Sequence, residues 1–128
     1  MMSVAIVCLA TAIYFEARDQ SDEGQIAVAY SVINRVEHPK YKHTICDVVT
    51  DGCHYSFYCD GKSDKPKDQR AYNKALYLAG LTMLRVVRDP TNGATHYHTR
   101  SSSPWWARYY EITGIIEDHI FRKDTSKS

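Results

Sequence analysis

The feature that most restricts the fold is an apolar run near the N-terminus that ends at an acidic side chain. Residues 4–15 are apolar apart from Thr11, and Glu16 follows them directly. A helix that crosses a bilayer needs about 18–20 apolar residues, so this run is too short to span one. We therefore predict a buried helix over residues 3–18. A signal peptide is the alternative, because residues 10–12 mimic a cleavage site, but no charged segment precedes the run.

Length, composition and charge indicate one folded domain. The chain has 128 residues, of which 44% are hydrophobic and 24% charged, and these values exclude a disordered or fibrous chain. The net charge of +1 gives no electrostatic reason to expect nucleic acid or an anionic membrane as a partner, and we expect no insertion into a membrane. The ten Tyr combine an apolar ring with a polar hydroxyl, which suits a partly solvated groove. We expect a monomer with one domain over residues 1–122 and a frayed polar tail over 123–128.

Capping signals and apolar spacing predict two further helices. A Ser at position 21, followed by two acidic residues, begins the second helix, and Pro39 ends it. The third helix opens at Pro66 and closes before Pro90. Residues 41–61 lack this spacing, so we predict short extended pieces and turns there.

Two later segments have the pattern of strands. Residues 94–99 have the alternating side-chain pattern of a strand. Residues 109–121 mix β-branched and aromatic side chains around Gly114. We predict a single strand and a strand pair. The expected class is α+β, a mainly helical domain with a small antiparallel sheet.

The four cysteines are Cys8, Cys46, Cys53 and Cys59. None of them forms C-x-x-C, which argues against a zinc ribbon or a thioredoxin-like motif. An even count fits one or two disulfides formed in an oxidising compartment, and buried free thiols are an equal alternative. Three complete pairings are possible, and the residues do not choose among them.

Glu16 is the first candidate for chemistry. Its carboxyl follows apolar and aromatic residues at the end of a predicted helix. Burial disfavours the charged carboxylate, and so does the negative end of a helix, so both raise the pKa. A carboxyl that stays protonated near neutral pH can act as a general acid on a glycosidic oxygen. The alternative is an ion pair with Arg18 or another cation.

Two histidines on the predicted strand raise a second possibility. His96 and His98 are two residues apart, so both point to one face. They could bind zinc if His54, His119 or Asp60 completed the site. No accompanying metal-binding motif is present, so we favour hydrogen-bonding histidines that line a polar groove.

Trp105 and Trp106 are candidates for stacking on the apolar faces of sugar rings. The alternative is that one of them lies in the core and the other at a rim, because adjacent residues on any element face in different directions.

Nine short segments, taken together, resemble the bacterial cell-wall hydrolase family, which includes spore-cortex-lytic enzymes and similar phage endolysins. They span nearly the whole chain. The segments are CLA at 8–10, IYFEAR at 13–18, EGQIAVA at 23–29, VINRV at 32–36, CDVV at 46–49, CHYSFYCDG at 53–61, GATHYH at 93–98, PWWA at 104–107 and HIF at 119–121.

The resemblance implies a lysozyme-like fold whose residues 1–122 cleave the β-1,4 bond between N-acetylmuramic acid and N-acetylglucosamine in peptidoglycan. The family's Y-x-E-A-R motif places its acid/base at Glu16. The implied partner is the glycan strand, and no cofactor or metal is expected. The candidate substrate-binding residues are Tyr14, Ser56, Phe57, Tyr97, His98 and Trp105.

The chain departs from the family at Gln20, where members commonly carry a second Glu. Hydrolysis by the usual routes needs two carboxylates, whereas a lytic transglycosylase, as the resemblance suggests, needs only one. We therefore favour transglycosylation by Glu16. Asp22, Glu23 or Asp60 could serve as the second carboxylate of a hydrolase.

The family's Cys-Gln-Phe-Ser reads Cys-His-Tyr-Ser at residues 53–56, a change that could alter the contacts with sugar. A zinc-dependent peptidoglycan amidase and a non-catalytic glycan-binding module are the remaining alternatives. We expect action in the bacterial periplasm or cell wall. Without a signal peptide, the chain suits a phage endolysin released from the host cytoplasm by a holin.

Overall fold

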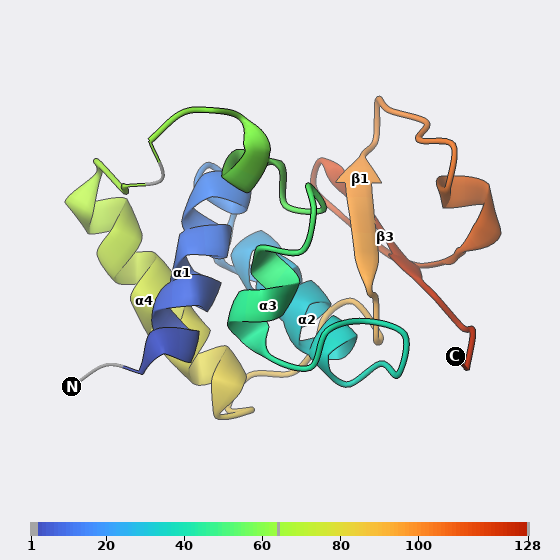
Figure 1. The fold of residues 1–128 in the computed structure, drawn as a ribbon, viewed down its shortest axis with the longest axis horizontal. Helices are drawn as coiled ribbons and strands as arrows, with labels where there is room; N and C mark the ends of the chain where they lie inside the picture. Colours follow the sequence, from blue (N-terminus) through green and yellow to red (C-terminus); the bar gives the residue numbers. More distant parts are fainter. Residues whose placement is uncertain (1–2, 64, 128) are drawn as a thin grey trace.

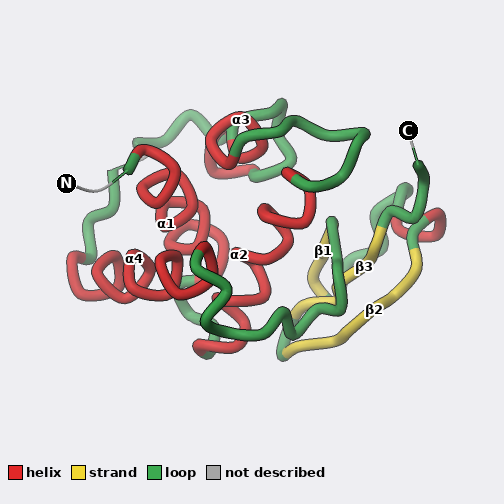
Figure 2. The backbone as a smooth tube through the Cα atoms, turned by 90° about the horizontal axis from the view of Figure 1, so that it is seen from below, coloured by secondary structure: helices red, strands yellow, loops and turns green. Residues whose placement is uncertain are grey.

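The computed structural model describes residues 3–63 and 65–127, and it divides them into a helical part and a small sheet. The helices are α1 (Val4–Ala17), α2 (Asp22–Val36), α3 (Ile45–Val49) and α4 (Gln69–Met83). Figures 1 and 2 show α2 in the middle, with α1 and α4 on one side of it and the sheet on the other. This arrangement confirms the α+β class.

Polar caps begin the three long helices. The side chain of Ser3 accepts a hydrogen bond from the backbone N–H of Ile6, and Ser21 and Asp68 cap α2 and α4 in the same way. Each cap satisfies a backbone donor that a helix start otherwise leaves without a partner. The first two helices thus begin where the sequence predicts, whereas α4 begins after Asp68 rather than at Pro66.

Helix α1 is the centre of the helical core. It packs against α2, α3 and α4, and Leu9, Ala10, Ala12 and Ile13 are fully buried. Neighbours on several sides explain why the buried positions of the run in residues 4–15 are apolar, whereas Val4 and Val7 near its start are exposed. No helix in the described part of the chain is long and apolar enough to cross a membrane.

The prediction for residues 41–61 was wrong in part. A short helix, α3, begins there after Thr44, whose hydroxyl caps the N–H of Asp47. A 3-10 helix, η1 (Ser56–Cys59), follows it. Helices of five and four residues are too short to display the 3.6-residue period from which helices are predicted.

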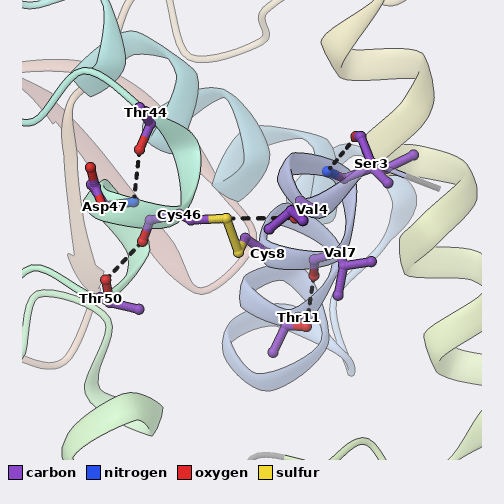
Figure 3. The surroundings of a disulfide bond; sticks show 10 residues. Ser3, Val4, Val7, Cys8, Thr11, Thr44, Cys46, Asp47 and Thr50 are labelled. Carbon is purple, nitrogen blue, oxygen red and sulfur yellow. Dashed lines mark hydrogen bonds between the residues drawn. A yellow bond between two sulfur atoms is a disulfide. The ribbon is translucent and has the colours of Figure 1, made fainter.

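The structure contains two disulfides, and each has at least one cysteine within residues 41–61. Cys8 bonds to Cys46, which ties α1 to α3 (Figure 3), and Cys53 bonds to Cys59. The disulfide prediction is therefore confirmed, and the alternative of free thiols is wrong, since no cysteine is free.

The sheet contains β1 (His96–Thr99), β2 (Glu111–Ile116) and β3 (His119–Lys123), in the order β1-β3-β2 with antiparallel pairs. A single-turn 3-10 helix, η2 (Ala107–Tyr109), precedes β2. The predicted strand pair is confirmed, but Gly114 lies inside β2 at a register irregularity. The chain turns instead around Glu117, whose φ is +51°.

The predicted frayed tail is wrong at its first two residues. Lys123 belongs to β3, and Asp124 is only 2% exposed. The Asp124 carboxylate accepts a hydrogen bond from the Tyr41 hydroxyl and forms an ion pair with Lys40 at 3.4 Å. The folded domain therefore extends past residue 122, because these contacts hold the chain beyond β3.

Candidate active site

A cavity of about 620 Å³ opens between the helical part and the sheet. Its walls come from the last turn of α2, from β1, and from the segments at 40–41, 51–54 and 105–110. Aromatic side chains dominate the wall, namely Tyr41, Tyr97, Trp105, Trp106 and Tyr110. Such a wall offers ring faces to an elongated ligand and hydroxyl or indole N–H groups to its polar atoms.

Glu16 lies in the last turn of α1 and does not itself line this cavity, but it is hydrogen-bonded to a residue that does. The Tyr97 side chain lines the cavity, and its hydroxyl donates a hydrogen bond to Oε1 of Glu16. Within the described residues, Oε2 of Glu16 has no hydrogen-bond partner, and the residue as a whole is half-buried. One carboxyl oxygen is thus held by the protein, while the other has no partner among the described residues.

Burial raises the pKa of Glu16 above its ordinary value, and the hydrogen bond from Tyr97 offsets part of that rise. The direction agrees with the sequence prediction. Burial also raises the pKa of Tyr97 well above its usual range, with the nearby Glu16 adding to the effect. Tyr97 therefore keeps its proton and acts as the donor.

The alternative role for Glu16, an ion pair, is not present among the described residues. The guanidinium of Arg18 lies 4.5 Å from the centre of the Tyr14 ring and donates a hydrogen bond to the Tyr14 hydroxyl instead. Because no cation neutralises Glu16, desolvation dominates its titration.

Tyr97 is held in place by both hydrophobic cores. It packs against the helical core and against the smaller core that includes Phe121 and Ile116. Phe121 is also its partner across the strand pair, and the ring of His119 meets it edge-on with centroids 5.1 Å apart. Packing on several sides fixes the ring and so fixes the hydroxyl that contacts Glu16.

Arg35 contributes a buried positive charge to the cavity, and the sequence analysis did not single it out. Its Nε donates to the carbonyl of Thr95, and its guanidinium lies 5.4 Å from the ring centres of Tyr41 and of Tyr55. Burial, reinforced by the charge of Arg35, lowers the pKa of His96 to about 3. His96 is therefore neutral at physiological pH.

Asp51 is a second residue that the sequence analysis missed, and it is the one carboxylate among the described residues that line this cavity. It follows α3 in a loop. No spacing pattern marks such a position, although Arg35 lies in the VINRV segment that carries part of the family resemblance.

The three carboxylates that the sequence suggested as a second acid or base lie outside the cavity lined by Tyr97. Asp22 is exposed and forms an ion pair with Lys74, and Asp60 accepts a hydrogen bond from the N–H of Lys62. Glu23 lines a separate cavity beside Arg88. None of the three lines the cavity next to Tyr97.

Two of the predicted substrate contacts have packing roles. Tyr14 is 2% exposed, and its hydroxyl accepts hydrogen bonds from the backbone N–H groups of Lys67 and Asp68. Phe57 is buried and stacks on Phe15 with centroids 5.0 Å apart. Neither side chain lines the cavity, so their direct contact with substrate stays a prediction.

Ser56, a third predicted contact, is the first residue of η1, and its side chain lies outside the described part of the structure. Trp105 has the exposure expected of a contact residue, because it is 78% exposed and lines the cavity. Trp106 is half-buried, and its ring lies 5.2 Å from that of His96. One tryptophan is therefore a rim residue and the other packs inward.

His98 lies in surroundings that oppose metal binding. Its Nδ1 donates to the carbonyl of Thr99, and its Nε2 accepts a hydrogen bond from Nε of Arg122 at 2.8 Å. The lone pair that would bind zinc is thus engaged by a cationic group. No three His, Cys, Asp or Glu side chains in the described ranges are grouped so that they could hold a metal ion.

Comparison with known sequences relates this chain to one family. The model of the family described as Cell Wall Hydrolase matches residues 19–122. The chain is 31% identical over 107 residues to the spore cortex-lytic enzyme of Halalkalibacterium halodurans, covering 80% of this chain and 30% of that protein. It is 29% identical over 105 residues to the spore cortex-lytic enzyme of Bacillus subtilis, covering 78% of this chain and 32% of that protein. The chain thus spans about a third of the length of these relatives.

Two solved structures share the fold. The catalytic domain of the germination-specific lytic transglycosylase SleB from Bacillus anthracis superposes with a TM-score of 0.75 at 25% identity, covering 95% of this chain and 97% of that domain. The catalytic domain of the Bacillus cereus SleB protein gives a TM-score of 0.74 at 26% identity, with coverages of 96% and 93%. The chain therefore has the fold of these catalytic domains.

Proposed function

The chain belongs to the cell wall hydrolase family, and from this premise we propose that it cleaves the β-1,4 glycan strand of peptidoglycan as a lytic transglycosylase. The observation that carries the proposal is the carboxyl of Glu16, which burial gives a raised pKa and which Tyr97 holds through Oε1. Oε2 has no partner among the described residues, and we take it as the oxygen open to the substrate. The SleB domain of B. anthracis, described as a lytic transglycosylase, supports the same chemistry.

In the first step Glu16 acts as the acid. Its open oxygen donates a proton to the glycosidic oxygen between N-acetylmuramic acid and N-acetylglucosamine, and the bond from that oxygen to the muramic C1 breaks. The raised pKa keeps the proton available near neutral pH. Positive charge develops on the muramic ring, and the newly formed carboxylate of Glu16 stabilises it.

In the second step Glu16 acts as the base. The 6-hydroxyl of the same muramic residue attacks C1, and its proton passes to the Glu16 carboxylate. The product carries a 1,6-anhydro ring, no water is consumed, and Glu16 returns to its protonated form. One carboxyl therefore serves both steps, which fits a chain with Gln at position 20.

Tyr97 positions this carboxyl, and the aromatic wall of the cavity binds the strand. The hydrogen bond from Tyr97 keeps Oε1 directed into the protein, so the proton resides on the oxygen that faces the substrate. Trp105 at the rim offers its ring to an apolar sugar face. We keep His98 as a contact for the substrate beyond this rim, and direct contacts from Tyr14, Ser56 and Phe57 as predictions.

Hydrolysis is the second candidate, because Asp51 lines the cavity. A hydrolase would use Asp51 to activate water or as a nucleophile, with Glu16 as the acid. The substitutions Glu16→Gln and Asp51→Asn distinguish the two on purified peptidoglycan. Transglycosylation predicts that Glu16→Gln loses activity by a factor of about 10²–10⁴ and that Asp51→Asn keeps activity within a few-fold. A comparable loss in both variants would favour hydrolysis.

We propose that the protein acts on the bacterial cell wall. More specifically, we propose that it does so as a phage endolysin. An endolysin would lower the turbidity of bacterial cells whose outer membrane has been permeabilised. Activity on isolated spore cortex alone would instead favour the role for which the relatives are named. Release by a holin and the monomeric state stay predictions.

A further inference from the structure

A second cavity, of about 510 Å³, lies beside the sheet, and three arginines line it. We call it the arginine pocket and define it by Arg100, Arg108, Arg122, His98 and Trp105. It is formed mainly by the end of β1, by β3 and by the segment that leaves β1 at the upper right of Figure 1. No Asp or Glu among the described residues lines it.

The three guanidinium groups have no acidic partner. Within the described residues, none of them has a carboxylate oxygen within 4.0 Å, whereas Arg85 contacts Glu37 at 2.7 Å elsewhere on the molecule. Three like charges around one cavity repel one another, and an anion in that cavity relieves the repulsion. The pocket therefore has the charge of an anion-binding site.

Arg122 is held in a fixed orientation. Its Nε donates to His98, and its Nη1 donates to the carbonyls of Ala107 and Tyr110, both at 3.0 Å. Its Nη2 has no partner among the described residues. Nη2 is therefore the group left to donate to an anion, and its position is already fixed, which reduces the entropy lost on binding.

The other two arginines lie on the more exposed side of the pocket. Arg108 donates to the hydroxyl of Tyr109 at 3.1 Å, with its guanidinium 5.1 Å from that ring centre. Arg100 contacts the carbonyl of Glu117 at 3.4 Å. Neither contact neutralises charge, so both groups remain available to an anion.

Trp105 lines both cavities, and the two are also joined along β1. His96 lines the larger cavity, and His98, two residues later on the same strand, lines the arginine pocket. Two residues of a strand span about 7 Å. A ligand bound in the larger cavity against Trp105 therefore has the arginine pocket within reach of its substituents.

We propose that the arginine pocket binds a carboxylate of the peptide stem carried by the glycan strand. This proposal rests on the proposed function, which places the strand in the larger cavity. A stem of four or five residues extends about 13–18 Å from its muramic acid, so it can cross the rim at Trp105. Its free carboxylates supply the negative charge that the pocket lacks, and the neutral sugars of the strand do not.

Binding of a free stem peptide tests the proposal without any cleavage. The probes are a soluble stem tetrapeptide and the same peptide with its carboxyl groups amidated, titrated against the full chain. We expect the acidic peptide to bind and its binding to weaken as salt is added. The Arg100→Gln/Arg108→Gln double variant should raise its Kd by about fivefold, since each exposed charge pair contributes modestly.

The matched control is the Arg70→Gln/Lys42→Gln double variant, which removes two exposed charges that line neither cavity and should leave the Kd unchanged. Equal binding of the amidated peptide, or the same Kd for the arginine variant and the parent, would overturn the proposal. Because no glycan is cleaved in this experiment, a protein that binds the stem but never cuts the strand would contradict the proposed function alone.

Discussion

The hydroxyl of Tyr97, on β1, donates a hydrogen bond to Oε1 of Glu16 at the end of α1, across 81 positions of sequence. This contact joins the sheet to the helical core at a carboxyl whose pKa is raised by burial. The sheet thus has a direct part in the proposed chemistry, because Tyr97 holds the acid through Oε1 and leaves Oε2 for the proposed proton transfer.

Tyr97→Phe should lower kcat by about tenfold to a hundredfold, because Glu16 loses the group that orients it. The hydrogen bond from Tyr97 stabilises the carboxylate, so its removal raises the pKa of Glu16 further. A general acid works while protonated, and the alkaline limb of the pH profile of kcat/KM should therefore move to higher pH. Tyr77→Phe on the exposed face of α4 is the control and should match the parent. A limb that moves to lower pH would contradict this role of Tyr97.

Glu16→Gln should stabilise the fold at neutral pH. A carboxyl whose pKa is raised in the folded state contributes stability below its unfolded pKa, and loses it as the pH rises through the folded pKa. Since Gln stays neutral, the variant should melt above the parent at pH 7 and level with it at pH 4. Glu111→Gln, at an exposed position on β2, should show no such pH-dependent gain. A melting temperature below that of the parent at pH 7 would mean that the Glu16 carboxylate is not destabilising.

The two disulfides should differ in their contribution to stability. Cys8 and Cys46 are 38 positions apart, whereas Cys53 and Cys59 are 6 apart. A longer closed loop restricts the unfolded chain more, so replacing the first pair by Ala should cost about 4 kcal/mol and replacing the second about 2 kcal/mol. Urea denaturation of the two double variants measures both losses. Equal losses, or a larger loss for the second pair, would show that chain entropy does not set the order.

Gln20→Glu, which introduces the acid that the family resemblance led us to expect at this position, should destabilise this chain. Oε1 of Gln20 is buried and has no partner within the described residues. Both Cβ of Gln20 and Oε1 of Glu117 lie 2.9 Å from the position that a Cβ on Gly24 would occupy, so the new carboxylate would be close to that of Glu117. We expect a lower melting temperature at pH 7 and a smaller loss at pH 3, where protonation of the new carboxyl removes the repulsion.

Adding Glu117→Gln to this variant tests the cause. If repulsion between the two carboxylates is responsible, the double variant should recover most of the lost melting temperature at pH 7. Glu117 also accepts hydrogen bonds from the N–H and hydroxyl of Ser21, and the single Glu117→Gln variant therefore serves as the reference. Additive losses in the double variant would point to lost hydrogen bonds and not to repulsion.

Local patterns in the sequence were enough to predict much of the fold. The apolar run, the Ser cap of α2 and the strand pair after residue 109 each carry their information within a few neighbouring residues. The raised pKa of Glu16 was also predictable, because it follows from the apolar and aromatic residues next to it in the chain.

The remaining features depend on contacts between distant segments. The Tyr97 hydroxyl, the pairing of Cys8 with Cys46 and the burial of Arg35 against Tyr55 all join residues far apart in sequence. No local period or capping motif reports such pairs. Helix α3 was missed for a related reason, since a disulfide and packing against α1 and α2 support its five residues.

The most direct test of the central claim is a mass spectrum of the soluble fragments that the protein releases from purified peptidoglycan. Transglycosylation by Glu16 predicts fragments that end in 1,6-anhydromuramic acid, each lighter by one water molecule than the hydrolysed form, and none from the Glu16→Gln protein. Fragments with reducing muramic ends would contradict the single-carboxyl mechanism, and intact disaccharides separated from their peptides would contradict glycan cleavage altogether.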